Sequence, residues 1–307
     1  MTRPIVIAHR GASGERPEHT RSAYELAIQQ RCDYVEPDLV FSKDGVLIVR
    51  HENEIGATTD ISGRPEFAER RTRKTIDGPQ VEGWFAEDFT LAELKTLRCR
   101  ERLPDLRPQN TRWDTLDDIL TLEELIGIVR DATQQRGRPV GLYVEMKHPA
   151  YFATLGYSMP DALADVLRKH DLDRADAAVI VECFEPDAVK AIRGLIAARC
   201  GQLIAEAGAM LTPKGLRDVA AYAQAIGVEK ALVTRDLCGG AHAAGLQVHA
   251  WTYRPENMFL PPAFRWGKDP SDHGDLEGEI AAAIAAGVDG VFCDCPGIAR
   301  AAVNRTF

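Results

Sequence analysis

The sequence predicts an α/β fold in which parallel strands alternate with helices. Apolar runs rich in Val and Ile recur along the chain, and patterns of helical period lie between most of them. Polar side chains also gather where several of these runs end. Alternation of this kind indicates a parallel sheet covered by helices, either closed or open. The nine candidate strands are close in number to the eight of a (β/α)₈ barrel.

The predicted strands are 5–8, 34–40, 46–51, 141–146, 178–184, 202–205, 231–234, 246–253 and 290–293. Ala23, Leu26 and Ala27 have the i, i+3, i+4 spacing of a first helix, and further helices are predicted at 115–136, 158–169, 185–198, 212–225, 236–244 and 277–286. Only five residues with a Lys-Asp-Gly turn signal separate strands 34–40 and 46–51. This connection is too short for a crossover helix, so we expect a hairpin-like pair.

The chain is predicted to be a single domain, 1–307, with one long insertion, although length alone also allows two ordinary domains. A typical barrel takes about 250 residues, and this chain has 307. Residues 56–114 contain four prolines and one clear helix start, at Thr90. Long segments of this kind are often lids or binding elements, so we expect 56–114 to cover the mouth of the barrel.

Composition excludes several classes of protein. The net charge of −9 argues against a nucleic-acid-binding surface. No apolar stretch is long enough for an integral membrane segment. Met1–Thr2–Arg3–Pro4 enters the first strand without the apolar region of a signal peptide, and the seven cysteines show no usual metal-ligand spacing. These features favour a cytoplasmic location, or a periplasmic one if a leader was removed.

The polar groups at the predicted strand ends indicate phosphate chemistry with a metal. Carboxylates on neighbouring strands form a hard oxygen site that suits Mg²⁺ or Ca²⁺. Two histidines beside such a site can divide general base and general acid duties. An arginine and a lysine supply positive groups for phosphate oxygens. The groups are His9 and Arg10, Glu36 and Asp38, His51, and Glu145 with Lys147.

Several short motifs in a fixed order identify a resemblance to a known family. They are His9–Arg10–Gly11–Ala12, Pro17–Glu18–His19–Thr20, Glu36-x-Asp38, Lys43–Asp44–Gly45, His51, Glu145-x-Lys147, Glu182–Cys183–Phe184 and the run from Asp289 to Pro296. In this order the chain resembles the glycerophosphodiester phosphodiesterase family, and its bacterial periplasmic branch most closely. The resemblance implies a TIM barrel with a long insertion after the third strand. It also implies metal-dependent hydrolysis of glycerophosphodiesters, such as glycerophosphocholine and glycerophosphoethanolamine, to sn-glycerol 3-phosphate and an alcohol.

The resemblance also implies roles for individual residues. Glu36, Asp38 and Glu145 match the ligands of one divalent cation, Ca²⁺ or Mg²⁺. His9 and His51 match the acid–base pair, and Arg10 and Lys147 match the phosphate contacts. Trp251 matches an aromatic residue that lines the alcohol or glycerol pocket, with plain packing as its alternative. The similar branch makes a homodimer a reasonable expectation.

Two features depart from the family pattern. Glu182 stands where the family more often has Gln or Ser, and it adds an acid that either binds the cation or alters its surroundings. Pro37 lies between Glu36 and Asp38 and has no N–H to donate, so we expect an irregular strand there.

Two other functions remain open at this stage. A lysophospholipase D acting on acylated lipids needs a wide apolar mouth, for which Trp84, Phe85 and Phe89 of the insertion are candidates. A non-catalytic barrel that binds phosphodiesters as a receptor would tolerate the loss of a catalytic group, whereas here the whole set is present.

Overall fold

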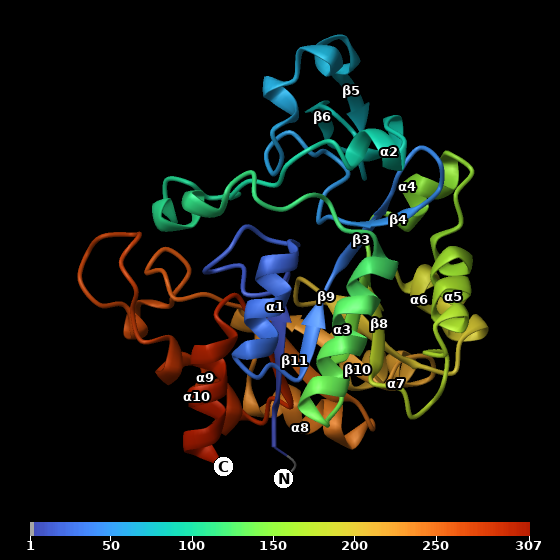
Figure 1. The fold of residues 1–307 in the computed structure, drawn as a ribbon. Coiled ribbons are helices and arrows are strands. Elements are labelled where there is room, and N and C mark those ends of the chain that lie inside the picture. Colours follow the sequence, from blue (N-terminus) through green and yellow to red (C-terminus); the bar gives the residue numbers. More distant parts are fainter. Residues whose placement is uncertain (1–2) are drawn as a thin grey trace.

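The chain forms a closed parallel barrel with helices outside it (Figure 1), as the sequence predicts. The structure is a computed structural model that describes residues 3–307; Met1 and Thr2, on which the expectation about a leader partly rests, lie outside the described residues. The ring closes because β2 pairs with both β1 and β7. Its strands are β1 (Ile5–His9), β2 (Tyr34–Glu36) continued by β3 (Asp38–Phe41), β7 (Gly141–Met146), β8 (Val179–Cys183), β9 (Arg199–Ile204), β10 (Ala225–Glu229), β11 (Gln247–Tyr253) and β12 (Gly290–Cys293).

The helices that follow the strands begin at clear start signals. Thr121 and Glu124 form a capping box at the start of α3, and the hydroxyls of Thr20 and Thr234 cap α1 and α8. The α-helices around the barrel are α1 (Arg21–Gln29), α3 (Leu122–Arg136), α4 (Pro149–Thr154), α5 (Met159–Lys169), α6 (Pro186–Leu195), α7 (Pro213–Ala220), α8 (Arg235–Ala243), α9 (Leu276–Ala286) and α10 (Pro296–Thr306). Among the described helices, none has the length and apolar character needed to span a membrane.

Pro37 interrupts one barrel strand without shifting it. Val35 pairs with Leu142 before the proline, and Asp38 pairs with Glu145 after it, so the register against β7 is the same on both sides. The Pro37 carbonyl accepts a hydrogen bond from the Glu145 N–H (2.9 Å). The strand is therefore irregular at Pro37, as expected, while Glu36 and Asp38 on either side of it remain in register with β7.

The third strand along the chain lies outside the ring. β4 (Leu47–Val49) pairs antiparallel with β3, which confirms the predicted hairpin. Segment 56–114 follows β4 and therefore separates the second and third strands of the barrel.

Residues 56–114 lie over the end of the barrel at which the parallel strands finish (Figure 1). Phe67, Phe85 and Phe89 are buried within this segment, and Phe67 and Phe89 join its elements to the main core. The segment contains the hairpin of β5 (Thr72–Thr75) and β6 (Gln80–Gly83), the short helix α2 (Leu91–Leu94), and the 3₁₀ helices η1 (Ile61–Gly63), η2 (Pro65–Arg70), η3 (Ala86–Asp88) and η4 (Pro108–Trp113).

One predicted strand is wrong. Residues 231–234 form the end of a 3₁₀ turn and the cap of α8, while the barrel strand is β10, within and just after the predicted helix 212–225. Gly227 weakens the strand signal, but the barrel needs a residue without a side chain there. A Cβ on Gly227 would lie 2.5 Å from Leu203 Cδ2 and 3.2 Å from Glu182 Oε2. The glycine thus leaves room for Glu182.

Candidate active site

A cavity of about 130 Å³ opens at the carboxyl end of the barrel strands, where (β/α)₈ barrels carry their active sites. Most of the side chains predicted for the site line this cavity, and Glu182 lies among them. Asp38 is buried but is not part of the lining. The predicted residues that line it are His9, Arg10, Glu36, His51, Glu145, Lys147 and Trp251.

Three glutamates converge in this cavity. Glu36, Glu145 and Glu182 each offer one carboxylate oxygen within 4.8 Å of the others, and all three are buried. Burial and the neighbouring acids raise the pKa of Glu36 and of Glu182 well above the usual value, and the pKa of Glu145 to about 8. Glu182 Oε2 is buried and has no hydrogen-bond partner. Buried acids that lack counter-charge are suited to hold a divalent cation.

Asp38 lies next to Glu145 and among basic side chains, and its predicted role as a cation ligand stays a prediction. Its Oδ2 lies 2.8 Å from His19 Nε2 and 3.2 Å from Arg10 Nε, and its Oδ1 lies 3.4 Å from Lys147 Nζ. Burial acts to raise the pKa of Asp38, but the charge of Lys147 and the hydrogen bond with His19 outweigh it and hold the pKa well below the usual value. Asp38 is thus already neutralised by the protein, whereas Glu182 is not.

His9 at the end of β1 is held by an acid that the sequence analysis did not single out. Its Nδ1 lies 2.7 Å from Asp294 Oδ1, just beyond β12. The other oxygen, Asp294 Oδ2, accepts hydrogen bonds from Arg107 Nη2 (2.7 Å) and Arg254 Nε (3.1 Å). Burial and the nearby Arg10 charge lower the pKa of His9 to about 4, so its imidazole is neutral near pH 7. An acid at Nδ1 orients the ring and leaves Nε2 available.

His51 has a matching arrangement. Its Nδ1 lies 2.5 Å from Glu52 Oε1, and Arg102 of the insertion donates to both oxygens of Glu52 (3.0 and 2.6 Å). Arg102 also pairs with Glu18. Burial and the charges of Arg10 and Lys147 lower the pKa of His51 to about 3. Each cavity histidine therefore has an acidic partner that an insertion arginine holds.

The phosphate-binding candidates lie between these histidines and the acids. Arg10 has a φ of +58°, and its backbone N–H donates to Glu36 Oε2 (2.8 Å). Gly11 follows with a φ of +85°, and a Cβ there would lie 2.8 Å from the Ala23 carbonyl carbon. The tight Arg-Gly turn thus needs glycine. Lys147 Nζ lies 2.7 Å from Glu145 Oε1.

Two aromatic rings line the same cavity. Phe184 and Trp251 meet edge to face, with ring centroids 5.7 Å apart, and Phe184 is 39% exposed. The insertion aromatics considered for an apolar mouth lie elsewhere. Phe85 and Phe89 are fully buried, and Trp84 Nε1 donates to the Phe67 carbonyl (2.8 Å).

Comparisons with known sequences all point to one family. The profile of the glycerophosphoryl diester phosphodiesterase family matches residues 9–298. A glycerophosphodiester phosphodiesterase of Arabidopsis thaliana is 32% identical over 329 residues, covering 96% of this chain and 85% of the plant protein. One from Haemophilus influenzae is 30% identical over 197 residues, covering 62% of this chain and 52% of that protein.

Solved structures share the fold. An Oleispira antarctica phosphodiesterase, solved in complex with the product sn-glycerol-3-phosphate, has a TM-score of 0.70 at 22% identity and covers 98% of this chain and 97% of its own. A glycerophosphodiester phosphodiesterase from Agrobacterium tumefaciens has a TM-score of 0.64 at 20% identity, with 97% and 99% covered.

Proposed function

Because this chain belongs to the glycerophosphoryl diester phosphodiesterase family and is a glycerophosphodiester-hydrolysing enzyme, we propose that His9 and His51 catalyse this hydrolysis at the carboxyl end of the barrel. One observation carries the proposal. Two imidazoles, each held by an acid at Nδ1, line a single cavity together with Arg10 and Lys147. Neutral imidazoles, positive phosphate contacts and a buried acid cluster are the groups that phosphodiester cleavage requires.

The two imidazoles divide the proton transfers. One removes a proton from the glycerol hydroxyl of the substrate or from water, and its acid partner stabilises the imidazolium that forms. The other imidazole protonates the departing alkoxide. It must itself carry a proton first, and the negative charge of the bound phosphodiester favours this protonated form of the imidazole. Arg10 and Lys147 bind the phosphoryl oxygens and stabilise the charge that develops on them.

Glu36, Glu145 and Glu182 are the residues that would hold one Ca²⁺ or Mg²⁺, because their buried oxygens converge and Glu182 Oε2 has no hydrogen-bond partner. Enzymes of this family generally depend on a divalent cation. A bound cation supplies neutralising charge at the phosphorus centre. Asp38 then serves Arg10 and Lys147, whose side chains it orients toward the phosphate.

Phe184 and Trp251 form the part of the site that would receive the alcohol. Their rings line the cavity, and Phe184 remains partly open to solvent. The negative face of an aromatic ring attracts the trimethylammonium group of choline. We therefore expect glycerophosphocholine to be a substrate that releases sn-glycerol 3-phosphate, the product bound in the Oleispira antarctica structure.

The test is product release by the purified protein. Glycerophosphocholine and glycerophosphoethanolamine are incubated with the enzyme in EDTA and then with Ca²⁺ or Mg²⁺ added back, and sn-glycerol 3-phosphate is measured. Turnover that EDTA stops and one cation restores supports both reaction and metal. A folded sample with no turnover under any cation contradicts the proposal, and lysophosphatidylcholine is then the substrate to try.

A further inference from the structure

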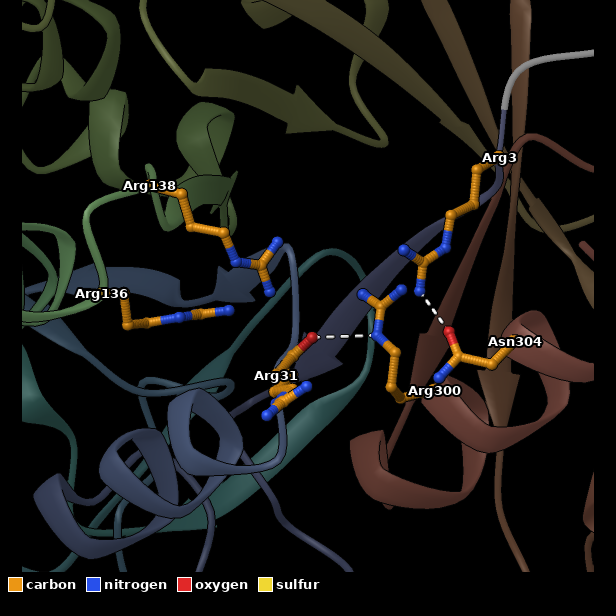
Figure 2. Close-up of a pocket in the computed structure, with 6 residues that line it drawn as sticks. All are labelled: Arg3, Arg31, Arg136, Arg138, Arg300 and Asn304. Carbon is orange, nitrogen blue, oxygen red and sulfur yellow. Dashed lines mark hydrogen bonds between the residues drawn. The ribbon is translucent and has the colours of Figure 1, made fainter.

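Five arginines surround a cavity of about 520 Å³ at the amino end of the barrel, opposite the active site. Two of them precede β1 and β2, one ends α3, one follows α3, and one lies on α10. Figure 2 shows the guanidinium groups of four of them, all but Arg31, turned toward one another. We call this set the arginine cluster: Arg3, Arg31, Arg136, Arg138 and Arg300. Since the whole chain carries a net charge of −9, the cluster is not part of a generally basic protein.

The positive charge of the arginine cluster is not balanced by the protein. Asp33 forms an ion pair with Arg300, and its Oδ1 lies 3.7 Å from Arg138 Nη1. Asp33 Oδ2 also accepts a hydrogen bond from the Val6 backbone N–H (2.8 Å). Within residues 3–307, Arg3, Arg31 and Arg136 have no carboxylate within 4.0 Å. The five arginines and the one aspartate together carry a net charge of +4.

Two members of the cluster are fixed in place by the fold. Arg300 is 7% exposed, and its Nε donates to the Arg31 carbonyl (3.0 Å). Arg136 Nη1 donates to the Cys32 carbonyl (3.4 Å), while its Nη2 is buried and has no partner. Burial and the charges of Arg138 and Arg300 lower the pKa of Arg136. An anion in the cavity would satisfy the free donor and relieve this repulsion.

We propose that the arginine cluster binds a small anion carrying a diphosphate group. The planar fork of arginine matches phosphate oxygens, and several forks around one cavity favour a ligand with many such oxygens. The cavity is of the size that small-molecule ligands occupy and exceeds what one phosphate fills. The four excess positive charges also suit a diphosphate better than a singly phosphorylated ligand. This site is separate from the phosphodiester site and does not depend on the proposed function.

The experiment is calorimetric titration of inorganic pyrophosphate into the full-length protein. EDTA removes divalent cations, and saturating sn-glycerol 3-phosphate occupies the active site. Orthophosphate and ADP are titrated in parallel. The test variant is Arg136→Gln/Arg138→Gln. Its control, Arg217→Gln/Arg235→Gln, removes the same charge from two exposed helical positions outside the cluster.

We expect saturable binding of pyrophosphate, at least about tenfold tighter than that of orthophosphate. The test variant should weaken it at least about tenfold, the control should not, and both should retain wild-type phosphodiesterase activity. ADP binding as tight as that of pyrophosphate identifies a nucleotide as the source of the diphosphate, and weaker binding identifies a free polyphosphate. The proposal is overturned if pyrophosphate does not bind, if both double variants weaken it equally, or if orthophosphate binds equally well. Binding to vesicles of anionic phospholipid without binding of pyrophosphate also overturns it.

Discussion

Glu182 lines the active-site cavity and Asp38 is buried behind it, and the two acids differ in what they contact. Glu182 has an oxygen without a partner and lies with Glu36 and Glu145, whereas Asp38 already contacts His19, Arg10 and Lys147. We predict that Glu182→Gln raises the dissociation constant for Ca²⁺ or Mg²⁺ at least about tenfold. Asp38→Asn should lower turnover but leave cation binding nearly unchanged. Calorimetric titration of the cation into metal-stripped protein measures the dissociation constant of each variant. Weakened binding in Asp38→Asn alone would restore Asp38 as the ligand.

Trp251 contributes to the choice of alcohol if its ring contacts choline. We predict that Trp251→Ala raises the KM for glycerophosphocholine about fivefold, because a cation–π contact is worth about 1 kcal/mol. The KM for glycerophosphoethanolamine should rise less, since its smaller, strongly hydrated ammonium gains less from the rings. Steady-state kinetics with both substrates decide this. Equal losses for both substrates would assign Trp251 to packing only.

At the scale of elements, the insertion takes part in the chemistry through Arg107. This side chain donates to Glu256 and to Asp294, which holds His9. Removing its charge leaves Asp294 more negative beside His9, which favours the imidazolium. We predict that Arg107→Gln lowers kcat about tenfold and moves the acid limb of the kcat/KM profile to higher pH.

Arg112→Gln is the matched control, because Arg112 is an exposed arginine of the insertion that contacts Trp113 instead of the site. Its profile should coincide with that of the wild type. Thermal unfolding of Arg107→Gln shows whether the variant is folded at the assay temperature. If Arg107→Gln is folded and the pH profile of its kcat/KM is unshifted, Arg107 has a structural role only.

Sequence patterns predict the barrel strands well where an apolar run ends in a charged group, as at His9 and Glu145. They fail at β10, because Gly227 breaks the apolar run, and the reason for this glycine lies on two other strands, in the space that Leu203 and Glu182 occupy. Asp294 is missed for a similar reason. An aspartate after a strand is ordinary by itself, and its role depends on His9, which is 285 positions away in the chain. The internal fold of the insertion could not be predicted because its 3₁₀ turns carry no regular period.

For the whole molecule, buried neutral histidines predict a loss of stability in acid. Burial lowers the pKa of His249 from 6.5 to about 4, and the side chain is fully buried against the Tyr143 hydroxyl (2.9 Å). The unfolded chain therefore binds a proton below about pH 6.5, while the folded chain does so only below about pH 4. Between these values the free energy of unfolding falls as the pH falls, by at most about 1.4 kcal/mol per pH unit for this group.

Urea unfolding of the wild type and of His249→Gln, in EDTA between pH 5 and pH 7.5, tests this prediction. The glutamine keeps an amide for Tyr143 but does not titrate. The difference in unfolding free energy between the two proteins should therefore shrink as the pH falls. A difference that is constant with pH would mean that His249 is not the titrating group.

The arginines that reach from residues 56–114 into the active site also bear on protein engineering. Trimming this segment to obtain a minimal barrel enzyme would delete Arg102, which holds Glu52, and Arg107, which holds Asp294 together with Arg254. The shortened chain would keep both histidines and their acid partners yet lose an arginine contact to each of these acids. A smaller catalyst on this scaffold needs new donors for Glu52 and Asp294, placed on the barrel itself.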